Sequence, residues 1–308
     1  MTGAGLGVYA GGMSAEYICC ICGLAHQPPQ PPEFPSVRCN VRHYAPGRFG
    51  VWRCSGCGSI HAGEDVDLRD YYKHYPFFGQ KLDWALRAGY RGLLRRLRRA
   101  GLRRKHRVLD FGCGSGLLVQ FLQEQGYDAV GYDPYSTTHC DPEIFVEKTY
   151  DVVIAQDVVE HAPEPMEILK TLDSLVRPGG IIVIGTPNAT GIDLADTEKF
   201  VHPLHQPYHR HIFAIDALCK AGEGLGWQKL RTHSTPYTNM PLLSLPFLHH
   251  YMRASDGTID ALFDRSVRLK LWLDPRTYFY LLLGYFLCND ADILAIFKTT
   301  KKKQAEKP

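Results

Sequence analysis

The stretch "RVLDFGCGSGLLVQFLQEQGYDAVGYDP", from Arg107 to Pro134, decides the fold. A short apolar run is followed by a turn with three glycines at alternate positions, then by a segment with helical periodicity. A second apolar run ends in an acid, Asp133. Glycines after a strand let the backbone pass close to a ligand at a helix N-terminus, and an acid at the tip of the next strand can accept both hydroxyls of a ribose. The stretch therefore predicts a strand, turn, helix and strand that bind a nucleotide or nucleoside.

The glycine spacing indicates which ligand this is. The turn reads Gly112-Cys113-Gly114-Ser115-Gly116, whereas a dinucleotide site needs its third glycine one position later and a pyrophosphate on the helix end. Asp110 precedes the turn, where a carboxylate would repel a pyrophosphate but suits an amine. These features favour S-adenosylmethionine, which carries a sulfonium, an amino-acid group and a ribose but no phosphate.

Strand and helix patterns alternate from Lys105 onward, which is typical of a parallel α/β sheet. We read "VRPGG" (176–180) as a helix end followed by chain breakers. The predicted strands are 107–111, 128–132, 152–156, 181–185 and a closing strand at 290–299. The predicted helices are 116–125, 163–175 and 215–224. The expected fold is a Rossmann-like, doubly wound, mostly parallel sheet.

Five motifs occur in order along this region: "VLDFGCGSG", "VGYDP", "YDVVIAQDVVEHAPEP", "LVRPGGIIVIGTPN" and "HRHIFAIDAL". They resemble the successive motifs of class I S-adenosylmethionine-dependent methyltransferases. They are most similar to the branch with ubiquinone-type O-methyltransferases and natural-product and sugar methyltransferases. The resemblance covers about residues 105–227.

The resemblance implies positions for the cofactor. The region 135–148 is shorter than usual, so the family's acidic adenine contact after the third strand has no clear counterpart. Asp133 matches the ribose-binding acid, Pro134 is expected near the adenine, and Gln156 matches a backbone contact to the methionine part. The loop under the methionine part corresponds to Asp110, Gly112, Cys113, Gly114 and Gly116.

The first candidate catalytic group is "QDVVEH", with Asp157, Glu160 and His161. In a helix these residues would lie about one turn apart on one face, with the spacing of metal ligands. The pattern resembles the Glu-x-x-Glu-His of metal-assisted relatives, with Asp in place of the first Glu. A catalytic divalent ion is therefore one alternative. The others are His161 as a general base or substrate-positioning group, and Glu160-His161 as a support for the loop over the site.

The second candidate group is "VHPLHQPYHRH", with four histidines within ten residues: His202, His205, His209 and His211. We expect one or more of them to line the acceptor pocket. His209 and His211 match the family's histidine before the next helix, although a structural role would explain each one singly. The candidate catalytic residues are thus Glu160, His161, His209 and His211.

Two cysteine pairs near the N-terminus share one form, Cys19-x-x-Cys22-Gly and Cys54-x-x-Cys57-Gly. This spacing lets both thiolates of a pair face one metal, and the glycine allows the tight turn. We predict a structural four-sulfur zinc site, against the alternative of four ordinary buried thiols. Cys20 and Cys39 could substitute as ligands.

The chain divides by composition. We expect a disordered leader at 1–16, a zinc-ribbon-like module at 17–62, and a linker with a basic amphipathic helix at 63–104. The methyltransferase domain then spans 105–300, with a cap insertion at about 236–288, and a Lys-rich tail follows at 301–308.

Composition limits the partners. A net charge of +3 does not favour nucleic acid. No apolar run is long enough to span a membrane and no secretory signal is visible, so a cytoplasmic protein is expected. The arginine-rich segment 91–107 is either a solvated helix or a contact for anionic lipid or a phosphorylated substrate. Beside it, the apolar cap suits a prenylated or carrier-bound acceptor or a homodimer interface.

The sequence thus predicts transfer of a methyl group from S-adenosylmethionine to a small molecule, on a hydroxyl oxygen of a sugar, phenol or quinol. Zinc-knuckle extensions also occur in sugar C-methyltransferases, so carbon methylation of a nucleotide-linked sugar is the runner-up. A non-catalytic methyltransferase-like scaffold is a third hypothesis, which the intact glycines and Asp133 disfavour.

Overall fold

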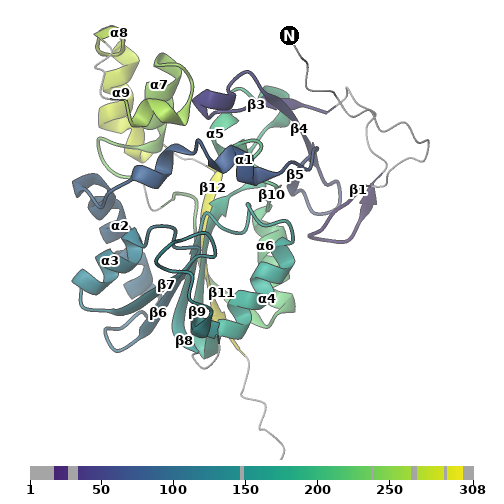
Figure 1. Cartoon of the computed structure of the whole chain (residues 1–308), viewed down its shortest axis with the longest axis vertical. Helices are drawn as coiled ribbons and strands as arrows, with labels where there is room; N and C mark the ends of the chain where they lie inside the picture. The colour runs from purple at the N-terminus through teal and green to yellow at the C-terminus, as the bar shows by residue number, and fades with distance from the viewer. Residues whose placement is uncertain are drawn as a thin grey trace, which may run out of the picture.

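The computed structural model describes residues 17–26, 34–145, 149–236, 239–264, 269–287 and 290–300. Its centre is a six-stranded sheet in the order β11-β12-β9-β8-β6-β7 (Figure 1). Neighbouring strands among β7, β6, β8 and β9 are parallel, whereas β12 runs antiparallel to both β9 and β11. The predicted α/β fold with a mostly parallel sheet is confirmed. The strand bounds are β6 Arg107–Phe111, β7 Asp128–Tyr132, β8 Tyr150–Gln156, β9 Val176–Pro187, β11 Trp227–His233 and β12 Asp292–Thr299.

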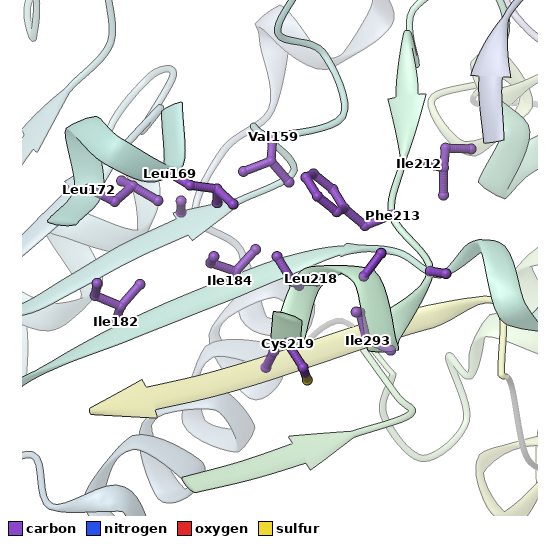
Figure 2. Packing of buried hydrophobic residues seen from close by; sticks show 14 of the residues in the cluster. Val159, Leu169, Leu172, Ile182, Ile184, Ile212, Phe213, Leu218, Cys219 and Ile293 are labelled. Atoms are coloured by element: carbon purple, nitrogen blue, oxygen red, sulfur yellow. The ribbon is translucent and has the colours of Figure 1, made fainter. Parts of the chain in front are cut away.

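Helices cover both faces of this sheet, which is why its strands are apolar on both sides. On one face, α2 (Trp84–Ala100) and α3 (Leu117–Glu124) pack on buried residues of β6, β8, β9 and β12. On the other, α4 (Pro165–Leu175) and α6 (Ile215–Gly224) form a second core (Figure 1). Figure 2 shows members of that second core: Leu169, Leu172, Ile182, Ile184, Phe213 and Leu218.

The start of β9 differs from the prediction. We expected residues 176–180 to end a helix and break the chain, but they begin the strand. Val176 pairs with Tyr150, and the next pair joins Val152 to Ile181, so the intervening residues bulge out of the ladder. Gly179 has φ of 75°, a left-handed conformation that glycine adopts without strain. The glycines therefore accommodate a bulge inside the strand.

The basic amphipathic segment forms α2 as expected, and its leucines are buried. Asp83 accepts a hydrogen bond from the Leu86 N–H at 2.8 Å and so caps the first turn. Gly101, with φ of 114°, ends the helix. Leu93, Leu94 and Leu97 lie in the core beneath it.

Smaller elements join the N-terminal module to the main sheet. A four-stranded sheet has the order β10-β5-β4-β3, and its strand β10 (His211–Ile212) comes from the histidine loop of the main domain. The module's elements are β1 Tyr17–Ile18, β2 Ala25–His26, β3 Ser36–Arg38, η1 Arg42–Tyr44, β4 Arg48–Arg53 and β5 Ile60–Ala62. The linker forms α1 (Leu68–Tyr72) and η2 (Pro76–Gly79).

A helical cap precedes the last strand. It packs on the N-terminal module, where Arg42 forms ion pairs with Asp256 (2.6 Å) and Asp264 (2.7 Å). The cap contains α7 Leu245–Ala254, η6 Ile259–Leu262, α8 Leu269–Leu273, α9 Pro275–Leu283 and η7 Gly284–Phe286. The remaining short elements are η3 Pro142–Phe145, η4 Ala189–Gly191, η5 Leu194–Asp196 and α5 Val201–Leu204.

Within the described ranges, no helix has the length and apolarity needed to cross a membrane. The predicted leader at 1–16 and tail at 301–308 lie outside the described residues.

Candidate active site

The strand order defines where a ligand can enter. From β6 the chain continues to β7 on one side, while β8 lies on the other side. The connections that leave β6 and β7 therefore run toward opposite edges of the sheet. Where the strand order reverses in this way, a crevice forms outside the carboxyl ends of the strands. The glycine turn leaves β6 at this edge, Asp133 follows β7 and Gln156 ends β8. The predicted cofactor residues therefore meet at one edge of the sheet.

The glycine turn has a backbone that other residues rarely adopt. Gly112, Gly114 and Gly116 have φ of 77°, 53° and 78°. A Cβ on Gly112 would overlap the side chain of Val158, and one on Gly116 would overlap the imidazole of His139. The turn thus needs glycine for its conformation and for the close approach of its neighbours.

Asp133 is held by the backbone of the loops around it. One carboxylate oxygen accepts the Gly114 N–H at 2.9 Å and the other accepts the Tyr135 N–H at 2.8 Å. Pro134, the next residue, is exposed. These bonds fix the carboxylate at the rim of the crevice and leave further lone pairs for hydroxyl donors.

A small polar cavity of about 80 Å³ lies beneath the turn. Burial, with a smaller effect from Asp133, raises the pKa of its Asp110 to about 8. Among the described residues, the buried side-chain nitrogen of Gln156 has no hydrogen-bond partner. The cavity therefore holds an acid that is mostly protonated at neutral pH and a donor that a ligand could use. Its lining residues are Tyr90, Asp110, Gly112, Cys113, Leu118 and Gln156.

The loop after β8 corrects one expectation. Residues 157–161 form a bend and a turn rather than a helix, so Asp157, Glu160 and His161 do not share a helical face. Asp157 has φ of 54°, which turns the chain away at the end of the strand. Instead, Glu160 and His161 gather with His209, and their ligand atoms lie within 4.8 Å of one another.

His161 has a defined tautomer. Its Nδ1 lies 3.1 Å from the carbonyl oxygen of Tyr208 and 3.2 Å from the phenol oxygen of Tyr72. Because a carbonyl only accepts, the ring proton belongs on Nδ1, and Nε2 of the neutral ring keeps its lone pair. Burial lowers the pKa of His161 to about 4. At neutral pH the residue is therefore an uncharged imidazole with a free basic nitrogen.

Glu160 is buried beside this imidazole. One carboxyl oxygen accepts a hydrogen bond from the Thr186 hydroxyl at 3.0 Å, while the other has no hydrogen-bond partner within the described ranges. Burial, reinforced by Asp157, raises the pKa of Glu160 well above its ordinary value. Burial of this carboxyl thus disfavours its charged form.

Three further histidines have defined partners, and two of them, His202 and His205, are bonded from the N-terminal half of the chain. His205 donates through Nδ1 to the side-chain oxygen of Asn40 at 2.6 Å and accepts from the Tyr75 phenol at 3.3 Å. His209 donates through Nδ1 to the carbonyl oxygen of Pro203 at 2.8 Å, so Nε2 of the neutral ring carries the lone pair. Asn40 also donates to Nδ1 of His202 at 3.2 Å.

Sequence reasoning missed the residues outside residues 105–300 that complete the site. They are Asn40, Tyr72, Tyr75 and, in the cofactor cavity, Tyr90. The segment "DLRDYYKHYPFFGQ" carried a usable signal, because three tyrosines in five residues are unusual for a solvated linker.

His211 lies in a different cluster from His161. Its Nδ1 is 2.9 Å from Nδ1 of His61, and its Nε2 donates to the carbonyl of Pro163 at 3.0 Å. Its ligand atom lies within 4.8 Å of those of His61 and Cys20. The structure therefore brings together three of the four predicted catalytic residues, Glu160, His161 and His209, and leaves His211 apart.

The four predicted zinc ligands converge, with their sulfur atoms within 4.8 Å of one another. The Sγ atoms of Cys19 and Cys57 are 3.7 Å apart, and those of Cys22 and Cys54 are 3.6 Å apart. A tetrahedral zinc site with Zn–S bonds of about 2.3 Å requires sulfur separations of roughly 3.8 Å, so the donor set fits the ion. Cys39 belongs to another buried cluster.

The parallel sheet, the glycine turn and Asp133 are the features expected of an α/β domain for a nucleoside-type ligand. Residues 61–232, more than half of the chain, match a family model described as a methyltransferase domain. The chain belongs to this family. It therefore contains a methyltransferase domain.

Curated relatives and solved structures resemble parts of the chain. A ubiquinone biosynthesis O-methyltransferase of Aliivibrio fischeri is 32% identical over 104 residues, which are 27% of this chain and 44% of that protein. One from Aeromonas salmonicida is 29% identical over 147 residues, 39% of this chain and 62% of that protein. The chain thus spans about half the length of these relatives. A putative sarcosine dimethylglycine methyltransferase from Galdieria sulphuraria is 16% identical, with a TM-score of 0.43, covering 70% of this chain and 87% of that one.

Proposed function

We propose that the protein transfers a methyl group from S-adenosylmethionine to a hydroxyl oxygen of a small molecule, such as a sugar, phenol or quinol. The observation that carries this proposal is the neutral imidazole of His161, whose unprotonated Nε2 lies in the loop that follows β8. A base of this kind suits an acceptor whose proton must leave, as a hydroxyl proton does. The names of the relatives, which are O-methyltransferases, support transfer to oxygen.

The cofactor would be held by the cavity and the turn above it. The Asp133 carboxylate would accept the ribose hydroxyls, with Pro134 near the base. The amino-acid group would lie near Asp110 and Gln156, beneath the glycine turn. The fit rests on the unpartnered Gln156 nitrogen and on the space left by the absent glycine side chains. When bound, S-adenosylmethionine supplies an electrophilic methyl group.

His161 would accept the hydroxyl proton at Nε2, while Tyr208 and Tyr72 keep its ring in place through Nδ1. His205 and His209 would line the acceptor pocket. The alternative of a divalent ion bound by Glu160, His161 and His209 draws on the closeness of their ligand atoms. Carbon methylation of a nucleotide-linked sugar remains the alternative reaction and draws on the cysteine module.

Calorimetric titration with S-adenosylhomocysteine tests the cofactor site. We expect Asp133→Ala to weaken binding about 100-fold, because two hydrogen bonds to a charged group are lost. Asp128→Ala is the control, since Asp128 lies at the opposite end of the same strand. Equal affinity of the Asp133 variant and the wild type would refute the proposed site. Tight binding without turnover on any acceptor would favour the scaffold hypothesis.

We also propose that Cys19, Cys22, Cys54 and Cys57 bind a structural zinc ion. Nε2 of His26 lies 3.1 Å from the sulfur of Cys54, where its N–H group could donate to the thiolate. Elemental analysis of the purified protein should find about one zinc per chain. Cys22→Ser should lose the metal, whereas Cys140→Ser, which changes an equally exposed cysteine, should keep it. The proposal would be contradicted if the wild-type protein had the same melting temperature after removal of metal by a chelator as before it.

A further inference from the structure

The outer surface of the helical cap is unusually apolar. Leu273 and Phe286 are 82% and 77% exposed. The Tyr278 hydroxyl donates to the carbonyl of Trp272 at 2.9 Å, which joins α8 and α9 into one surface. A patch of this extent in water indicates a binding surface. Its exposed members are Leu269, Trp272, Leu273, Tyr278, Phe279, Leu282, Leu283 and Phe286.

The outward face of α2 is basic. Arg91, Arg95, Arg98 and Arg99 are exposed and recur at the spacing of one helical face, with Trp84 (70% exposed) on the same face. Within the part of the chain that the structure describes, Arg91, Arg95 and Arg99 form no ion pair. The helix therefore presents a row of unneutralised cations around an exposed indole.

These two surfaces adjoin. Arg96 of α2 donates to the carbonyl and hydroxyl oxygens of Thr235 at 2.7 and 2.9 Å, and it lies near Tyr285 of η7, next to Phe286. Figure 1 shows α2 and the cap on the same side of the molecule. We call the apolar patch and the arginine face together the cap–α2 surface.

The acids near this surface are already engaged. Asp256 and Asp264 pair with Arg42, and Asp274 pairs with Arg276 at 2.9 Å. A second copy of the chain docked face to face would therefore place arginines against arginines without an offset from these three acids. The charge pattern calls for a partner that is both apolar and anionic.

We propose that the cap–α2 surface binds the surface of an anionic lipid bilayer. Leucine and phenylalanine side chains would enter the acyl boundary, and the indole and phenol rings would lie at the headgroups. The arginines would contact lipid phosphates. This inference does not depend on the proposed methyl transfer.

Vesicle flotation of the full chain tests the proposal. We expect binding to vesicles of equal parts phosphatidylcholine and phosphatidylglycerol, no binding to phosphatidylcholine alone, and release at high salt. Arg95→Glu/Arg99→Glu should lower partitioning about 25-fold or more, and Leu273→Ser/Leu282→Ser about tenfold or more. Lys220→Glu on α6 and Leu230→Ser on β11 are matched controls on other surfaces and should bind like the wild type.

Thermal melts establish that each variant is folded. Failure of the folded wild type to bind the anionic vesicles would overturn the proposal. Equal losses in the cap–α2 variants and their controls would also overturn it. Sedimentation velocity then measures whether the chain forms a dimer. A dimer that Leu273→Ser/Leu282→Ser dissociates, without vesicle binding, would assign the surface to self-association instead.

Discussion

The crevice buries an acid on one side and a base on the other. The cavity under the glycine turn holds the carboxyl group of Asp110, whereas the loop after β8 holds the imidazole of His161, with Glu160 beside it. Burial raises the pKa of Asp110 to about 8 and lowers that of His161 to about 4. Both groups are therefore neutral at pH 7, because low polarity disfavours whichever form is charged.

The consequence differs between the sides. A neutral imidazole is already the basic form, so His161 is ready to accept a proton as it stands. A neutral carboxyl group is the inactive form toward a cation, so Asp110 gains its charge only when a positively charged ligand compensates for burial. One side is prepared in advance, and the other is completed by the ligand.

The largest expected effect is a loss of turnover when His161 alone is replaced. His161→Gln should lower turnover about 10²- to 10⁴-fold on a panel of phenol, quinol and sugar acceptors, because the proton acceptor is lost. Its affinity for S-adenosylhomocysteine should stay unchanged. His211→Gln is the control, since His211 lies in the other cluster. The production of S-adenosylhomocysteine measures turnover.

A full rate in His161→Gln would remove the base from the proposal. Dialysis of the wild type against a chelator then tests whether a divalent ion takes part in catalysis. Activity that is lost on dialysis and restored by Mg²⁺ or Mn²⁺ would favour a divalent ion bound by Glu160, His161 and His209 over general-base catalysis.

The same comparison shows what could be predicted from sequence. The glycine turn and Asp133 belong to one local unit of strand, turn, helix and strand, so spacing alone located them, and β6, β7 and α6 have the predicted bounds. The histidine side is built by long-range contacts, with Tyr72 and Asn40 reaching residues more than 80 positions away. Periodicity carries no information about such pairings. For the same reason it suggested a helical face for Asp157, Glu160 and His161 where the chain turns.

A smaller expected effect concerns Asp110. The affinity for the cofactor should depend on pH, because binding is linked to the loss of a proton from this carboxyl group. In the protein without ligand, the pKa of Asp110 is about 8, and the ammonium group of the ligand would lower this pKa in the complex. Below pH 8 binding must then release a proton, so affinity should rise by up to about tenfold per pH unit and level off above pH 8.

Calorimetry can detect this proton. At pH 7 close to one proton per site should pass to the buffer, so the binding enthalpy in Tris should differ from that in phosphate by about the difference between the buffers' ionisation enthalpies. Asp110→Asn should remove both this difference and the pH dependence, while Asp128→Asn, a surface change on β7, should keep them. Equal enthalpies in the two buffers would mean that Asp110 keeps one protonation state throughout. The contrast between a side prepared in advance and a side completed by the ligand would then fail, because the carboxyl would be either charged before the ligand arrives or neutral in the complex.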